Sequence, residues 1–494
     1  DKDKGKSVGV GASFGIAIAN MTVDAGIGQY RTLSAGGLNI EAIARNDLQT
    51  ITVSGADPLA IHREVSTGTG GTGGTGGTGT LPPGEPQDIA VNATVAVSFI
   101  KNYVKSHVDT NTIVTLIGGN IVPVMLPFKG ALPHGDVNLN MLALQTGHTL
   151  TQASGFAVGG QTAVGAAVAV NIADSLVDAL FDGNAIISGA ALLNAYTFNR
   201  DDSRAVATAV GADLDRYIKK LNTAPSHNPS AQPGTPNGMQ NTINTNLNGA
   251  GSSQSGGTPQ GTDTNLPLST NVLRTQDVGT EPNPNTSEAG GAVGSVITNL
   301  GSTPTGNGGD TNNQSRKNIQ VAAAVSANIT KHIANARIAG IMSAQSIEGV
   351  ADNDGNFRAM GTGAAANVSS TDANNAIAAG MAVSVNRNEA NVLFSGTLAA
   401  TGTDGGEDDG TITAKAELTQ NMDGAYRGLL GAQALAGALS KGSEAKGGGD
   451  YVAAGAIGII VSHAKSTARI GDNAEVTGGN ITISAADKSK LAVR

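Results

Sequence analysis

The chain has 494 residues, 69 of them glycine, with a formal net charge of −9, no cysteine, no tryptophan and an aromatic content of only 3%. This length exceeds what one compact core needs, so we expect several domains or an open-ended repeat array. The lack of cysteine excludes disulfides and thiolate metal sites, and the absence of a basic stripe argues against nucleic acid as a partner.

Residues 7–20 are predicted to form the first strand, because large apolar residues alternate strictly with Gly, Ala and Ser. The same alternation returns five times, in residues 88–99, 162–172, 318–329, 376–386 and 452–462. Aligning the six copies places six small residues at one common position: Ala12, Ala93, Ala166, Ala323, Ala379 and Gly455. Internal repetition of this kind is typical of solenoids and repeat arrays.

Three further segments follow most copies: a shorter alternating stretch, an element often entered through Gly-Gly, and a segment that often carries Arg. Gly, Asp and Asn close them, which supply turn conformations. We therefore predict an all-β fold, an elongated parallel β-solenoid with long loop insertions and one short helix. The predicted solenoid units cover residues 1–65, 88–212 and 318–494.

Two insertions separate these units. Residues 66–87 begin as a Thr/Gly-rich tract that is predicted to be a loop, and residues 213–317 are polar and rich in Pro, Gly and Asn. Within the second insertion, residues 213–222 have apolar residues at helical spacing behind Asp213, a good N-cap, and are predicted to form a short helix. A loop of this length is usually functional, so we expect it to mediate contacts.

The two faces of each alternating strand differ in size, and we expect the large residues to point into a narrow core. A bare Gly/Ala face lets another layer approach closely. That layer is either another part of this chain or a neighbouring subunit or fibre. On the second alternative, the predicted assembly face comprises Gly9, Gly11, Gly15, Gly165, Ala167, Ala322 and Gly380.

Chemistry is sparse in the sequence. Two acidic, Gly-containing segments are predicted to be turn loops, and their carboxylates could hold calcium: Asp352 and Asp354 in the first, and Asp404, Asp408 and Asp409 in the second. A solvated turn is the competing interpretation. No catalytic motif is found, and no cofactor other than this possible Ca²⁺ is expected. A β-helical lyase or hydrolase acting on polysaccharide is the alternative function.

Residues 33–47 and 476–489, LSAGGLNIEAIARND and VTGGNITISAADKS, enter a strand through Gly-Gly and continue with alternating β-branched residues. In this the chain resembles large bacterial surface proteins of the filamentous-haemagglutinin and autotransporter type. The resemblance implies a right-handed parallel β-helix, export, and adhesion or fibre formation. The polar start, DKDKGK, carries no signal peptide, so the sequence is interpreted as a piece of a longer protein.

From these observations we expect a non-catalytic structural or adhesive protein at the bacterial cell surface or outside the cell. Its expected partners are other copies or segments of the same fibre, and a host or neighbouring-cell surface. No apolar run reaches the roughly 18 residues of a membrane-spanning helix, so no transmembrane segment is expected.

Overall fold

The computed structural model describes residues 8–56, 89–122, 136–159, 161–211, 318–367, 374–402, 410–420, 431–440 and 451–493. The predicted helix at 213–222, the Thr/Gly tract and the whole of the 213–317 insertion lie outside these residues. Within them the fold is all-β, as the sequence predicts, with nineteen strands in three parallel sheets. The described part of the chain contains no apolar helix of the length needed to cross a bilayer.

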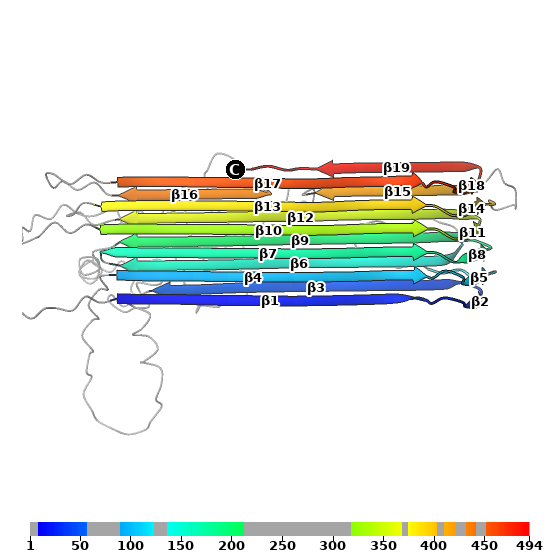
Figure 1. The fold of residues 1–494 in the computed structure, drawn as a ribbon, viewed down its shortest axis with the longest axis horizontal. Coiled ribbons are helices and arrows are strands. Elements are labelled where there is room, and N and C mark those ends of the chain that lie inside the picture. The colour runs from blue at the N-terminus through cyan, green and yellow to red at the C-terminus, as the bar shows by residue number, and fades with distance from the viewer. Residues whose placement is uncertain are drawn as a thin grey trace, which may run out of the picture.

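Each coil of the solenoid consists of a long strand, a short strand and a second long strand that returns in the opposite direction (Figure 1). The first long strands form sheet A: β1 (Val8–Ile27), β4 (Ile89–Val108), β7 (Thr162–Phe181), β10 (Asn318–Ile338), β13 (Asn374–Phe394) and β17 (Tyr451–Ile470). The short strands form sheet B at one end of the coils: β2 (Thr32–Ala35), β5 (Ile113–Leu116), β8 (Asn184–Ile187), β11 (Ile341–Ala344), β14 (Thr397–Ala400) and β18 (Glu475–Thr477).

Sheet C contains the returning strands and lies against sheet A. Its members are β3 (Leu38–Ala56), β6 (Val137–Gly159), β9 (Ala190–Gly211), β12 (Ser346–Asn367), β15 (Thr411–Gln420) and β19 (Asn480–Ser489). In the fifth coil this strand is divided, and β16 (Ala432–Ser440) pairs with the second half of β12. The molecule is thus a flat stack of six coils.

The register of sheet A confirms the six predicted copies. The aligned positions Ala12, Ala93, Ala166, Ala323, Ala379 and Gly455 are direct partners along a single row across all six strands. The first two predicted segments of each unit are one strand of about twenty residues, because the alternation continues without a turn between them. The hydrophobic period therefore predicts the pairing correctly.

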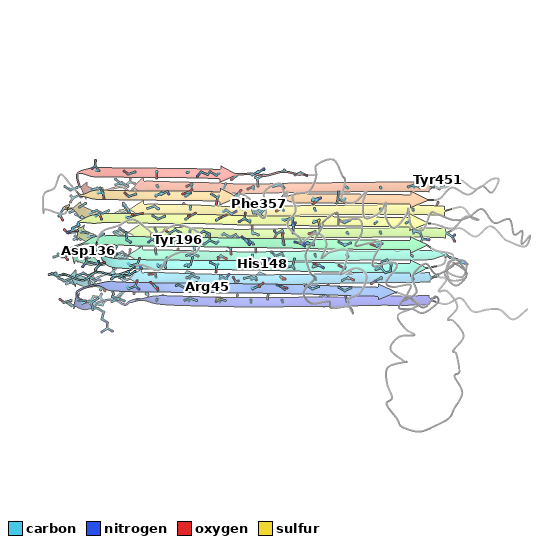
Figure 2. All side chains as sticks on the ribbon, turned by 180° about the vertical axis from the view of Figure 1, so that it is seen from behind. Arg45, Asp136, His148, Tyr196, Phe357 and Tyr451 are labelled. Atoms are coloured by element: carbon cyan, nitrogen blue, oxygen red, sulfur yellow. The ribbon has the colours of Figure 1, made fainter. Side chains whose placement is uncertain are left out.

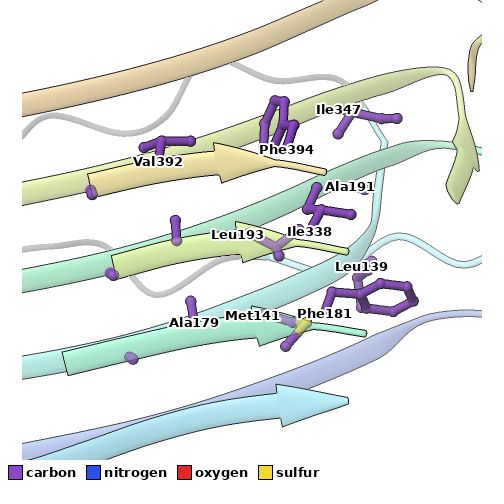
Figure 3. Close-up of a cluster of buried hydrophobic side chains, with 14 of the residues drawn as sticks. Leu139, Met141, Ala179, Phe181, Ala191, Leu193, Ile338, Ile347, Val392 and Phe394 are labelled. Carbon is purple, nitrogen blue, oxygen red and sulfur yellow. The ribbon is translucent and has the colours of Figure 1, made fainter. Parts of the chain in front are cut away.

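Between the sheets, the half of the molecule next to sheet B contains a conventional hydrophobic core. Its largest fully buried side chains include Phe181, Ile338 and Phe394 from sheet A and Met141 and Leu193 from sheet C. Figure 3 shows these side chains stacked in rows, one coil above the next. In this half the inward residues are the larger ones.

The other half of the interior contradicts the expectation that the large residues point inward. There Ala90, Ala96, Ala169 and Ala324 of sheet A face a second set of alanines from sheet C, Ala153, Ala157, Ala205, Ala207 and Ala209, all fully buried. The large residues of the same strand segments point outward. The reason is space, because both sheets present small residues here and their backbones approach closely.

Polar residues fill the rest of this close interface, and they form hydrogen-bonded ladders along the stack. Asn171 Nδ2 donates to Asn328 Oδ1 at 2.9 Å, and Asn328 Nδ2 donates to the Asp201 carbonyl oxygen at 2.7 Å. Ser326 Oγ donates to the Ser203 carbonyl oxygen at 2.7 Å. Buried polar groups are stable only when they are hydrogen-bonded, and these ladders meet that requirement. They fit between two sheets that lie too close together for large side chains.

Candidate interaction surface

The outer face of sheet A has an apolar half, formed by the six outward-pointing residues within the first eleven paired positions of each long strand. In β1, Val10 is 74% exposed, Phe14 68% and Ile18 71%. Their partners in the other five strands are almost all aliphatic or aromatic; the Phe14 row continues as Val95, Val168, Val325, Met381 and Ile457. We call this surface, bounded by Val8, Ile18, Tyr451 and Val461, the apolar face.

The apolar face is large for a protein surface. With a rise of about 3.3 Å per residue and about 4.8 Å between strands, it measures roughly 33 by 24 Å, or about 800 Å². Contiguous apolar patches on monomeric soluble proteins are usually about 300–600 Å² and often mark interaction sites. Thr162 and Asn375 in its outermost row are its polar exceptions, and it contains no charged side chain.

A charged row closes the apolar face at the next outward position. It contains Asn20, Lys101, Asp174, Lys331, Arg387 and His463, one from each strand of sheet A. Lys331 Nζ lies 3.7 Å from Asp174 Oδ1, and Arg387 Nη2 lies 2.7 Å from Glu389 Oε1. Beyond this row the outer face of sheet A carries both polar and apolar residues. The boundary of the apolar face therefore runs along the stack, across all six strands.

The residues predicted as an assembly face point the other way. Gly9, Gly11, Gly15, Gly165, Ala167, Ala322 and Gly380 belong to the inward set of sheet A, and Ala167 and Ala322 are 1% exposed. A Cβ atom on Gly165 would collide with the backbone of Thr208 in sheet C, and one on Gly380 would collide with Leu435. The layer on these residues is therefore another part of the same chain, which was the first of the two alternatives.

The first predicted calcium segment is not a turn loop. Asp352 and Asp354 lie within β12, on the outer side of sheet C, where Asp352 is buried and Asn356 Nδ2 donates to Asp354 Oδ1 at 3.1 Å. Asp404, Asp408 and Asp409 lie outside the described residues. Among the residues that the structure describes, no three His, Asp or Glu side chains gather closely enough to hold a metal ion.

Sheet C carries a buried ion cluster that the sequence did not suggest. Arg358 from β12 donates to Asp202 from β9 through Nε at 3.0 Å and Nη2 at 2.9 Å, and Arg204 Nη2 donates to Asp202 at 2.8 Å. Burial would raise the pKa of Asp202, but the two guanidinium groups outweigh it and lower that pKa to about 2. Asp202 therefore remains a carboxylate that binds two strands together.

A second buried acid faces the interior. Asp201 Oδ2 lies 2.8 Å from His332 Nε2 of sheet A, and both side chains are buried. The pair joins the two sheets at the level where the aliphatic core gives way to the small-residue core. Alternation in NRDDSR (199–204) places Asp201 and Asp202 on opposite faces, with Arg204 on the face of Asp202. The other partners, His332 and Arg358, come from the next coil, so only the strand register identifies them.

The outer side of sheet C is more polar than that of sheet A. Figure 2 shows Arg45, His148 and Tyr196 on β3, β6 and β9 of this sheet. His148 Nδ1 lies 3.2 Å from Asp47 Oδ1 of the neighbouring strand. This exposed ion pair is solvated, whereas Leu142, Leu144, Tyr196 and Val350 elsewhere on the same side are buried together. The apolar face of sheet A, whose large β1 residues are more than half exposed, is therefore the main candidate for contacts.

Comparisons with known proteins give no assignment. No protein-family model matches the chain, and no curated protein or solved structure is significantly similar to it.

Proposed function

We propose that this chain is a non-catalytic structural or adhesive segment of an exported bacterial repeat protein, which builds a fibre, a sheath or an adhesin stalk. The observation that supports the proposal most directly is the common register of the six long strands of sheet A. Each of these strands pairs with the next in the same alignment, so further coils would extend the sheet along one axis.

The ends of the stack support axial growth. Among the described strands, β1 and β17 each pair on one side only, so each leaves a row of backbone N–H and C=O groups open. Such an edge is a template for another strand. Further coils of the same polypeptide, or another copy of the chain, would pair with this edge. The product would be a flat fibre about 70 Å wide, because each long strand has about twenty residues.

The alternative of a polysaccharide-acting enzyme has less support. Such an enzyme needs two carboxyl groups facing each other across an open groove. Two acids of β9, Asp201 and Asp202, are buried and engaged with His332, Arg204 and Arg358. They serve the packing of the strands. The similarity of residues 33–47 and 476–489 to exported surface proteins supports the structural alternative.

Two measurements test the proposal. Negative-stain electron microscopy of the purified chain should show flat rods or ribbons about 70 Å wide that lengthen with protein concentration. Protease added to intact cells of the producing bacterium should remove the protein while a cytoplasmic marker persists. A protein that is protected until the cells are lysed would contradict export, and turnover of a uronate-rich polymer by the purified chain would contradict the non-catalytic role.

A further inference from the structure

The apolar face of sheet A has no covering layer among the described elements. Sheet C packs on the inner side of sheet A, and sheet B lies at the end of the coils. The outward valines and isoleucines in the middle strands, such as Val168 and Val170, are only partly buried, and they are shielded by their neighbours in the same row. A sheet face that is apolar on the outside normally packs on a second layer.

The dimensions of the apolar face match those of a protein–protein interface. Stable interfaces of standard size bury about 800 Å² on each partner, and the apolar face offers about that area without a charged residue inside it. Charged side chains begin at the Lys101 and Asp174 row and continue beyond it. An apolar centre next to a charged row on one side is consistent with the anatomy of such an interface.

A second copy of this chain suits the apolar face better than a lipid surface does. Two flat sheet faces pack together at about 10 Å, with their side chains interdigitated. Figure 1 shows the strands of the stack running nearly parallel, so one apolar face presents a regular surface to another. Insertion into a bilayer would expose the open edges of β1 and β17 to hydrocarbon, and a net charge of −9 disfavours an anionic membrane.

We propose that two copies of this chain associate face to face through the apolar face of sheet A, in a twofold-symmetric contact that buries the Phe14, Ile16 and Ile18 rows. In a twofold contact the same patch serves both partners. The pairing is lateral, at right angles to the axial stacking of coils, and it does not depend on export or adhesion.

The test measures the oligomeric state of the full chain, residues 1–494, by sedimentation velocity and light scattering between about 0.1 and 50 µM. The smallest species of the wild type should be a dimer, to which axial stacking adds only multiples of that dimer. Val168→Lys places a charge at the centre of the apolar face on both copies, and Ile16→Lys does so on β1, where the side chain is 55% exposed and contributes little to the core. Each substitution should raise the dissociation constant of the dimer by at least about a hundredfold.

The matched control is Ile186→Lys, because Ile186 is 64% exposed on sheet B, away from the apolar face. It should dimerise like the wild type. Circular dichroism and thermal melts of all variants identify any loss of fold, and Ile16→Lys remains informative if Val168→Lys does not fold.

Three results would overturn the proposal: a wild type that is monomeric at 50 µM, a folded Ile16→Lys protein that dimerises like the wild type, or a monomeric wild type that binds phosphatidylcholine vesicles. The last would identify lipid as the occupant. These failures differ from failure of the proposed function: surface-exposed monomers would refute only the pairing, and dimers confined to the cytoplasm would refute only export.

Discussion

Glycine at position 165 illustrates how closely the two long sheets approach at the small-residue end. The inner side of sheet A there lies against the backbone of Thr208, and a single added methyl group has no space. Small residues at these positions are therefore a packing requirement within one molecule, and a surface role for them is excluded by the contact.

Gly165→Ala should destabilise the fold by about 2 kcal/mol, because the extra methyl forces the two backbones apart. The matched control is Gly455→Ala in β17, at an outward position where an added Cβ meets no atom within 4 Å. It should be neutral or slightly stabilising. Thermal melts of both variants check this, and equal melting temperatures for the two would contradict the close approach described here.

Asp202 should make stability depend on pH at acidic values. The pKa of Asp202 is about 2 in the folded chain and 3.8 in the ordinary, unfolded state, so the folded state is favoured whenever the carboxyl is ionised. That contribution, about 2 kcal/mol, is fully present above about pH 4 and is lost as the pH falls from about 4 to about 2.

Denaturant titrations of the wild type and of Asp202→Asn between pH 7 and pH 2 measure this contribution. The variant should be less stable at pH 7, because Arg358 and Arg204 lose the charge of the buried Asp202 carboxylate, and it should lose less stability below pH 4. Asp487→Asn, an exposed carboxyl on β19, should behave like the wild type. The same acid slope in Asp202→Asn as in the wild type would exclude the cluster as its source.

At the scale of the elements, the internal polar ladders hold sheet A and sheet C together in the half of the molecule where the core contains only small side chains. Asn328 is fully buried and bonded on three sides: to Asn171 in the next strand, and to the backbone of Asp201 and Arg358 in sheet C. Because three buried hydrogen bonds would be lost, Asn328→Ala should cost about 2–3 kcal/mol in unfolding free energy.

The comparison for Asn328 is Asn391→Ala, which removes an amide ladder on the outer side of the same sheet. Asn391 Nδ2 donates to Asn335 Oδ1 at 3.0 Å, and the site is only partly buried, so water can replace the bond. We expect a loss below about 1 kcal/mol. Chemical denaturation of both variants measures the loss in unfolding free energy that each ladder causes. A larger loss for Asn391→Ala than for Asn328→Ala would contradict the assignment of inner and outer faces.

The sequence predicts the strands and their register well, but it predicts poorly which face of each strand points into the core. Alternation determines which residues share a face, so Ala12 and its five equivalents were aligned correctly. It does not determine which face is inside. The usual rule places large residues inside, but the returning strand also carries small residues in this half, such as Ala205 and Ala207, and only the pairing of the two sheets shows this.

The candidate site was missed for the same reason. The size rule places Val168 and its row in the core, and the second of the two alternatives makes Gly165 and Ala167 an assembly face. Both place the surface available for contacts on the side of the strand that is buried in the structure. Small residues in both long segments of a coil were the signal that could have corrected this. The cluster around Asp202 needed the neighbouring coil, since Arg358 is more than a hundred and fifty residues away.

At the scale of the whole molecule, stability should vary along the stack. In a repeat array each coil contacts only its neighbours, so the terminal coils have one stabilising interface and the central coils have two. β7 and β10 are paired on both sides, whereas β1 is an edge. Opening at the ends therefore costs less than opening in the middle.

Hydrogen–deuterium exchange with peptide resolution should show the slowest exchange in β7, β9, β10 and β12 and the fastest in β1, with rates at least about tenfold apart. Within sheet A, β1 and β7 have the same length of 20 residues, so they can be compared directly. Uniform protection across all six strands of sheet A would mean that the stack unfolds as one cooperative unit.

Strand pairing in the third and fourth coils has a consequence for how such a chain can change in evolution. β9 ends at Gly211 and β10 begins at Asn318, yet β10 takes the same register on β7 that β13 takes on β10 after residues 368–373 alone. The register of the ladder therefore does not depend on the length of the connection between a returning strand and the next coil. Such a junction is a natural grafting point, where a foreign domain could be displayed without a change in any pairing that follows it.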